Sequence, residues 1–233
     1  MSVEAGTPLP PRRRHPTMAE AALEELREAI ILGELTPGTP LRLEDLAGRL
    51  GMSISPIREA VRRLEALGLA ELVPHQGAKV VALDTDDLRD LFEVRLGLET
   101  TALRRACSRF SEADFARARA ALDMSAAARD AGDVRGAMRS HTEFHFTLYE
   151  ASGSHWLPRL IRPAWDSTER YRPALFSGPE DLQQRHHRLD EELLAACRAH
   201  DGDRAARALR EHLALADTFY ARELGGRSLL PPE

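Results

Sequence analysis

The side chains best suited to chemistry are three histidines and one aspartate in the second half of the chain. His141 and His145 are four residues apart, so on a helix their side chains share one face. Asp190 and His212 come from two later helical segments, each at a position expected to face inward. Three imidazoles and one carboxylate can bind a divalent transition metal such as Zn or Ni inside a helical bundle. Two histidines at this spacing are also common without a ligand, so the residues alone leave both interpretations open.

Residues 52–63, with the sequence MSISPIREAVRR, are typical of the start of a helix that reads DNA. Ser55 can cap this helix because its hydroxyl can accept an otherwise unpaired backbone N–H, and Pro56 then suits the first helical position. Apolar residues recur at i, i+4 and i+7 and predict a buried stripe: Ile57, Val61 and Leu64.

Arginines away from this stripe are the expected contacts with phosphates or base edges. Arg58 follows the serine–proline start, at the helix end that normally enters the groove. Arg62 and Arg63 lie further along, and a solvated surface charge is an equally good interpretation of Arg62. An apolar helix over 43–50 precedes them and ends at Gly51. Two helices joined by such a short turn form a helix-turn-helix.

The residues that follow predict a hairpin over 71–81, with its turn near 75–77. Such a hairpin is a wing whose tip can lie beside nucleic acid. Gln76, Gly77 and Lys79 are therefore candidate contacts, with ordinary turn residues as the alternative.

Upstream, Thr17 and Glu20 have the spacing of a capping box and open an amphipathic helix that ends near Gly33. The order of three helices and a hairpin predicts a winged helix-turn-helix domain over 17–83. Residues 1–16 are expected to form a disordered tail, because they are rich in proline and poor in apolar residues.

Charge does not by itself indicate a nucleic-acid partner. The formal net charge is −5, and residues 1–83 carry ten Lys and Arg against eleven Asp and Glu. DNA binding must then depend on where single arginines lie. Lys79 is the only lysine of the chain. We find no signal peptide and no apolar run long enough to span a bilayer, so we expect a cytoplasmic protein without membrane contact.

Beyond residue 83, helical periodicity predicts six helices with short connections, at about 85–107, 111–130, 133–151, 154–176, 179–200 and 202–224. They predict an antiparallel six-helix bundle over 84–226, followed by a flexible tail over 227–233. The expected fold class is therefore mainly α. Cys107 and Cys197 lie among apolar helical residues and are expected to be reduced, buried thiols.

The first part of the chain resembles the GntR family of bacterial transcription regulators. The resemblance is ungapped over about 18–83 and rests on segments that match the family pattern: LTPGTPL at 35–41, LGMS at 50–53, PIREA at 56–60, RLE at 63–65 and GAxV at 77–80. It implies a homodimer bound to a palindromic double-stranded DNA operator.

The resemblance also implies roles for individual residues. Arg58 stands at the family's main recognition-helix arginine, and Ser53 at a serine or threonine that contacts phosphate. Gln76 and Gly77 match the wing tip that enters the minor groove. Ile54 departs from the pattern, because many members carry an arginine there, which puts one base or phosphate contact in doubt.

The second part resembles the FadR C-terminal, or FCD, domain in its six-helix VanR-like version, over about 86–220. The matching segments are VRxxLE at 94–99, EFHxxLYEASG at 143–153, LLxA at 193–196 and RxHL at 210–213. In many members an aspartate and a histidine four residues later bind metal with two further histidines. Here His141 stands at the aspartate position and Asp190 at a histidine position. A compensated exchange, a decayed site, or substitution by His186 would each explain this pattern.

Arg95 is the candidate effector-binding residue. It falls on the inner face of its helix if the neighbouring apolar residues form the core, and a semi-buried guanidinium requires an anion. The anion is either Glu99, one turn away, or the carboxylate of a ligand. The resemblance implies a pocket in which a metal and this arginine hold a small organic acid. Aromatic residues of the fourth helix could line that pocket or pack in the core: Trp156, Trp165, Tyr171 and Phe176.

These features predict a ligand-responsive DNA-binding regulator, a repressor by family resemblance, whose two parts communicate through residues 82–87. A metal-dependent enzyme is the alternative, because HTEFH at 141–145 superficially resembles a metallohydrolase helix. The metalloprotease pattern requires glutamate directly after the first histidine, where this chain has Thr142. A DNA-binding dimer without an effector is the third possibility.

Overall fold

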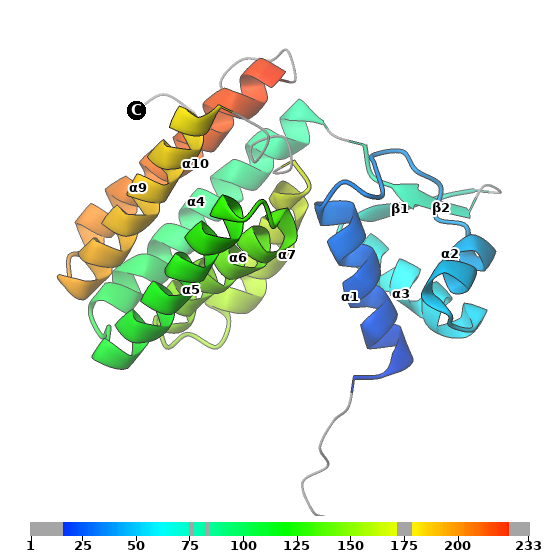
Figure 1. Ribbon diagram of the computed structural model, residues 1–233, viewed down its shortest axis with the longest axis horizontal. Coiled ribbons are helices and arrows are strands. Elements are labelled where there is room, and N and C mark those ends of the chain that lie inside the picture. Colours follow the sequence, from blue (N-terminus) through cyan, green and yellow to red (C-terminus); the bar gives the residue numbers. More distant parts are fainter. Residues whose placement is uncertain (1–15, 75–76, 83, 172–178, 224–233) are drawn as a thin grey trace, which may run out of the picture.

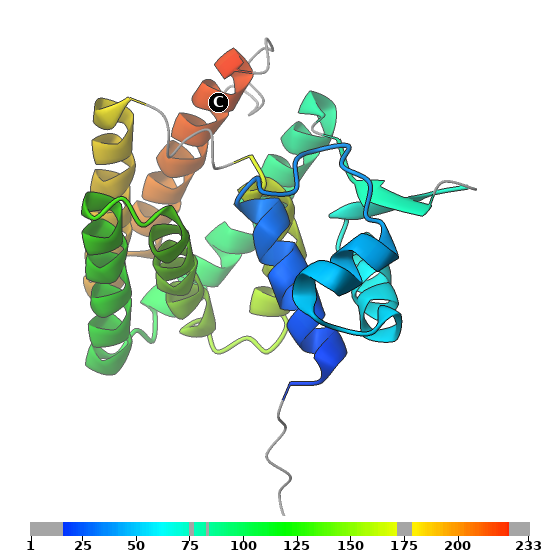
Figure 2. The same cartoon turned by 45° about the vertical axis from the view of Figure 1, so that its right-hand side comes forward.

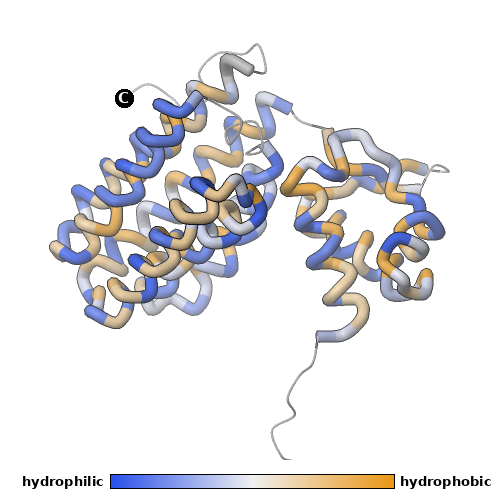
Figure 3. Tube along the Cα trace, in the orientation of Figure 1, coloured by the Kyte–Doolittle hydropathy of each residue, from blue (hydrophilic) through white to orange (hydrophobic). Residues whose placement is uncertain are grey.

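The computed structural model describes residues 16–74, 77–82, 84–171 and 179–223. It contains a small winged unit beside a larger helical bundle, with α1 on the side of the winged unit that faces the bundle (Figures 1 and 2). Each unit has its own hydrophobic core. Apolar and polar residues alternate along the helices of both units (Figure 3). The mainly α fold expected from the sequence is confirmed.

The winged unit contains three helices and one antiparallel hairpin: α1 Met18–Ile31, α2 Leu43–Leu50, α3 Ile54–Ala66, β1 Ala70–Val73 and β2 Gly77–Val80. The expected capping box opens α1, because the Thr17 side chain accepts the Glu20 N–H and the Glu20 carboxylate accepts the Thr17 N–H. Gly51 ends α2 in the left-handed conformation, with φ 63°. Both signals were visible in the sequence.

The start of α3 differs from the sequence prediction. Ser53, rather than Ser55, is the N-cap, although its side chain makes no capping hydrogen bond. Ser55 and Pro56 therefore lie inside the first turn. Proline is tolerated there because the first N–H groups of a helix have no intrahelical acceptor. The apolar stripe is confirmed, since each of its three predicted residues is at most 3% exposed: Ile57, Val61 and Leu64.

The bundle contains six helices in the described ranges: α4 Thr85–Cys107, α5 Glu112–Asp130, α6 Val134–Glu150, α7 Leu157–Glu169, α9 Glu180–Arg198 and α10 Gly202–Glu223. Five of them match the predicted ranges within about three residues at each end. The fourth is shorter than 154–176, because α7 begins at Leu157 and ends at Glu169. Residues 172–178 lie outside the described part of the chain.

Cys107 of α4 and Cys197 of α9 are free, buried thiols, as expected. Their sulfur atoms lie 3.6 Å apart, a proximity that the sequence did not indicate. No helix in the described part of the chain has the length and apolar character needed to cross a membrane.

Candidate metal centre and nucleic-acid interface

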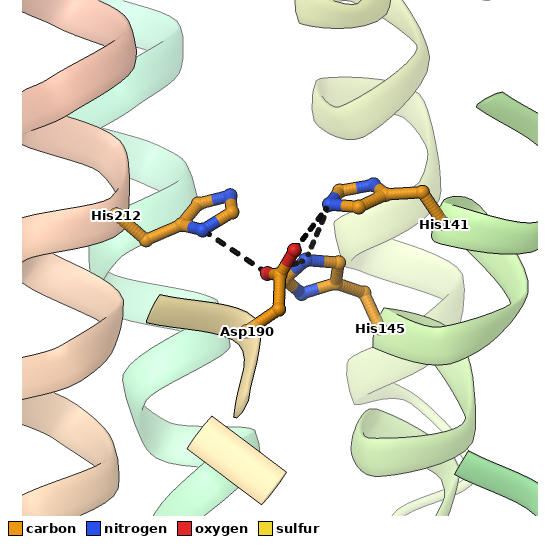
Figure 4. A group of neighbouring side chains, drawn as sticks. All are labelled: His141, His145, Asp190 and His212. Carbon is orange, nitrogen blue, oxygen red and sulfur yellow. Dashed lines mark hydrogen bonds and ion pairs between the residues drawn. The ribbon is translucent and has the colours of Figure 1, made fainter. Parts of the chain in front are cut away.

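The four candidate metal ligands meet inside the bundle (Figure 4). α6 supplies His141 and His145, α9 supplies Asp190, and α10 supplies His212. All four side chains are buried, and one ligand atom from each lies within 4.8 Å of the others. Helical spacing places the two histidines of α6 on one buried face, and the antiparallel packing of α9 and α10 brings the other two residues opposite them.

The ligand atoms are spaced as a small cation requires. His145 Nε2 lies 3.1 Å from His141 Nε2. The Asp190 carboxylate lies 3.4 Å from His141 Nε2, 3.2 Å from His145 Nε2 and 3.2 Å from His212 Nδ1. Tetrahedral zinc with bonds of about 2.0–2.1 Å places its ligand atoms roughly 3.3 Å apart. Asp190 Oδ1 and His212 Nδ1 are also buried without a hydrogen bond to any described residue. The donor set therefore fits a divalent transition metal.

Hydrogen bonds behind His145 orient its ring toward the centre. Tyr149, one turn further along α6, donates its hydroxyl to Glu99 Oε2 at 2.7 Å. The Tyr149 hydroxyl oxygen lies 3.2 Å from His145 Nδ1 and, since its own proton goes to Glu99, it accepts the Nδ1–H. This tautomer leaves the lone pair of Nε2 facing the other ligands, as metal binding requires. Burial lowers the pKa of His145 to about 4, which keeps the ring neutral near pH 7.

Asp190 supplies the negative charge of the centre from α9. Burial disfavours its ionised form, but His212 and His141 outweigh that effect and hold the pKa of the carboxyl well below its ordinary value. The structure thus brings together three imidazoles and one carboxylate, with the carboxylate on α9 and a histidine at the position on α6 where many family members carry the aspartate. This is the arrangement that an exchange of aspartate and histidine between the two positions predicts. His186 is buried beside His212, with ring centroids 4.6 Å apart, but lies outside the group of four.

Arg95 is buried, as expected, and is paired within the protein. Its Nε lies 2.6 Å from Glu99 Oε1, and its Nη1 donates to Thr168 Oγ1 at 2.8 Å. The guanidinium also lies 4.4 Å from the ring centroid of Trp165. The sequence left two candidate anions for Arg95, Glu99 or the carboxylate of a ligand, and in the structure Glu99 is the partner.

A small cavity of about 20 Å³, enough for roughly one water molecule, lies beside the centre, and its walls include both Arg95 and His212. The cavity also reaches apolar and aromatic side chains of α4 and α10: Phe92, Leu213, Ala216 and Tyr220. Contact between Arg95 and an effector stays a prediction, and this cavity is where it would occur.

The four aromatic residues named in the sequence analysis have different environments. Trp165 is fully buried, and its ring centroid lies 4.9 Å from that of His145. Tyr171 is buried and its hydroxyl contacts the backbone of Asp84. Trp156 is 65% exposed and lines none of the described cavities, because it precedes the first turn of α7. Phe176 lies outside the described residues.

The candidate DNA contacts at the start of α3 share an exposed surface. Ser53, Ser55, Arg58 and Arg62 are all exposed. Neither of these two arginines forms an ion pair with a described residue, so both guanidinium groups are available to an anionic partner. Arg63, by contrast, is paired with Glu59 on the same helix.

The wing carries the remaining candidates. Gly77 is exposed at the start of β2 with φ 86°, a conformation that glycine adopts without strain. Lys79 is 42% exposed and lies 3.1 Å from Glu71 on the opposite strand. Gln76 lies outside the described residues.

Two residues that support the centre, Glu99 and Tyr149, were not predicted from the sequence to contact a metal ligand candidate. The spacing of Tyr149, four residues after His145, was an available signal for a residue that supports a metal ligand.

A winged helix-turn-helix unit joined to a helical bundle with a buried His/Asp centre defines a class of transcription regulators with a separate sensor domain. Family models agree, because "Bacterial regulatory proteins, gntR family" matches residues 18–80 and "FCD domain" matches residues 90–215. The chain belongs to the GntR family of bacterial regulators, in the group that carries an FCD domain.

Individual relatives support this assignment. The chain is 30% identical to the HTH-type transcriptional repressor GlaR of Escherichia coli (strain K12), over 81% of this chain and 89% of that protein. The solved structure of E. coli McbR superposes with a TM-score of 0.80 at 25% identity, covering 89% of this chain and 99% of McbR. The similarity therefore extends across both units. The protein is a ligand-responsive DNA-binding regulator by family.

Proposed function

We propose that this chain is a repressor that binds a palindromic operator as a homodimer and responds to a small carboxylate. In this proposal residues 17–83 bind DNA, and residues 84–226 form the sensor and dimerisation domain. GlaR is named a repressor, and a helix-turn-helix dimer presents two recognition helices to two half-sites. The observation that carries the proposal is the exposed start of α3, where Arg58 faces solvent without an acidic partner among the described residues.

The proposed DNA contacts have separate tasks. Arg58 reads a base edge, Ser53 and Ser55 contact phosphates near the N-terminus of α3, and Arg62 adds a further phosphate contact. Gly77, Lys79 and Gln76 belong to the wing beside them. Because residues 1–83 carry no net positive charge, specificity must come from these few placed side chains.

For the sensor domain we propose that a divalent transition metal, zinc or nickel, is held by four residues: His141, His145, Asp190 and His212. The bound metal would supply a Lewis-acidic site for a carboxylate oxygen. The adjoining cavity of about 20 Å³ connects the centre to Arg95 in its wall, and in this proposal it widens to admit the remainder of a small acid. The cavity supports this assignment because it adjoins both a cation site and a guanidinium.

Arg58→Ala tests the DNA-binding half of the proposal. An operator is first selected from random duplexes with the wild-type protein. Loss of a bidentate base contact should then weaken binding by about 1–3 kcal/mol at constant salt. The exposed bundle arginine Arg104 provides a control, because Arg104→Ala removes the same charge far from α3. Equal affinity of the wild type and Arg58→Ala would remove the assignment, and failure to select any operator would remove the proposed function.

His145→Ala tests the metal site. The purified wild type should contain a transition metal by elemental analysis after dialysis, and the variant should contain little. Binding of the selected operator by the metal-free variant would show that its DNA-binding unit is still folded. An unchanged metal content in the variant, or a wild type that takes up neither zinc nor nickel, would contradict the site.

A further inference from the structure

One face of α7 lies against the His/Asp centre. The ring of Trp165 is within 5.9 Å of His141 and 4.9 Å of His145, measured between centroids, and its Nε1 donates to Thr142 Oγ1 at 3.3 Å. One turn later, Thr168 accepts the hydrogen bond from Arg95. Because Trp165 is fully buried, its ring can change position only if its neighbours or α7 itself move.

The opposite face of α7 lies against the winged unit. The buried Asp166 carboxylate accepts two hydrogen bonds from Arg27 of α1, at 2.8 Å from Nε and 2.5 Å from Nη2. Ser167 Oγ donates to the backbone carbonyl of Leu67, just after α3, at 3.4 Å. Thus Trp165, beside the centre, and Asp166, bound to the winged unit, are adjacent in sequence.

The residues just after α7 extend this contact to the segment that joins the two units. Arg170 donates to the backbone carbonyl of Val81 at 3.5 Å and to Asp87 Oδ2 at 2.9 Å. The Tyr171 hydroxyl contacts the backbone of Asp84. The connection over 82–87, which the sequence indicated as the path between the units, is therefore itself held by the end of α7.

We propose that α7 transmits the metal occupancy of the His/Asp centre to the winged helix domain, and that the Arg27–Asp166 ion pair is the contact that responds. The inference rests on the proposed function, since it concerns how that metal centre regulates operator binding. An α-helix completes one turn in about 3.6 residues, so consecutive side chains leave the same rigid backbone in different directions. Any shift of α7 that repositions Trp165 must displace Asp166.

The Arg27–Asp166 pair is suited to such a role because it is bidentate and its carboxylate is buried, so the contact is either formed or broken. Leaving a buried carboxylate without its partner is strongly unfavourable. Arg162, one turn earlier on α7, has its Nη1 3.9 Å from Asp166 Oδ1 and moves with that helix. In this proposal it is the cation that remains beside Asp166 when Arg27 is displaced. A regulatory contact needs two such alternative arrangements.

The experiment compares the full-length wild type with Asp166→Asn and Arg27→Gln, each stripped by chelator and then loaded with Zn²⁺ alone. Hydrogen–deuterium exchange is followed in peptides from α6, which report metal binding, and from α1, which report transmission. Affinity for the selected operator is measured with and without Zn²⁺. In the wild type Zn²⁺ should change exchange in α1 and shift operator affinity by at least about fivefold.

In both variants we expect Zn²⁺ to protect α6 as in the wild type, while the response of α1 disappears and operator affinity becomes independent of Zn²⁺. Arg139→Gln is the matched control, because Arg139 of α6 pairs with Glu28 of α1 at 3.0 Å without involving α7. This control should retain the wild-type response.

The inference is overturned if α1 of the wild type does not respond to Zn²⁺, if both variants respond as the wild type does, or if Arg139→Gln loses the response equally. The exchange measurements contain no DNA. A failure to find an operator would therefore count against the proposed function, while the role of α7 would still be decided by the response of α1.

Discussion

At the scale of single residues, the centre depends on a chain of buried hydrogen bonds as much as on its four ligands. Arg95 contacts Glu99, Glu99 accepts the Tyr149 hydroxyl, and Tyr149 accepts from His145. Burial raises the pKa of Tyr149 well above its usual value, so the hydroxyl keeps the proton that it donates. These hydrogen bonds join the candidate effector-binding residue to a candidate metal ligand.

Tyr149→Phe should weaken metal binding, because His145 would lose the acceptor that fixes its tautomer. Loss of such a supporting partner costs about 10–100-fold in metal affinity. Competition with a chromophoric zinc chelator measures the change. Tyr171→Phe is the control, since Tyr171 is a buried tyrosine whose hydroxyl contacts backbone away from the centre. Equal affinity in Tyr149→Phe and the wild type would show that the hydroxyl does not orient the ligand.

The sequence could indicate the four side chains that meet in the centre, because two of them share a helix and the family pattern places the other two. The supporting residues could not be found as easily. Glu99 reaches Tyr149 across 50 residues of sequence, and periodicity within one helix carries no information on which helices become neighbours. Proximity of Cys107 and Cys197, separated by 90 residues, was invisible for the same reason.

At the scale of elements, local signals predicted most helix ends correctly. Capping boxes open α1 and α5, and glycine in the left-handed region ends α2. The fourth bundle helix was predicted too long, because residues 154–156 and 170–171 are not helical. Trp156 instead lies before the first helical turn and is exposed, while Pro163 is accommodated inside α7.

Two glycines, Gly48 inside α2 and Gly51 at its C-terminal end, allow a matched test of whether left-handed glycine determines where the helix ends. Gly51 has φ 63° and open space around it, so Gly51→Ala should destabilise the winged unit by about 1–2 kcal/mol through backbone strain alone. Gly48 lies within the same helix, also with open space, and Gly48→Ala should stabilise by roughly 0.5–1 kcal/mol. Urea unfolding followed by circular dichroism compares the two. Equal effects would mean that the left-handed conformation does not determine where α2 ends.

At the scale of the whole molecule, the His/Asp centre brings together buried polar side chains of α6, α9 and α10, three helices that also contribute to the apolar core. Asp190 and the histidines come from segments up to 71 residues apart in the numbering. A cation that binds only the folded arrangement therefore stabilises the packing of the entire bundle.

Removing the metal should accordingly lower the melting temperature of the protein, and readdition of Zn²⁺ should restore it. At a free metal concentration of about 100 times Kd, metal binding should raise the free energy of unfolding by roughly 2.7 kcal/mol. Differential scanning calorimetry with and without chelator measures the shift. In Asp190→Asn the two melting curves should coincide, because the only carboxylate of the centre is lost. A shift of wild-type size in that variant would place the stabilising metal elsewhere.

The single lysine offers a practical consequence of the arginine-rich composition. Lys79 is the only lysine in 233 residues, and it lies on the wing, 42% exposed and two residues after Gly77. Amine-directed reagents therefore have one internal target, on the hairpin that we place beside the minor groove. A fluorophore or photo-crosslinker attached there would report contact between the wing and a duplex without any cysteine engineering.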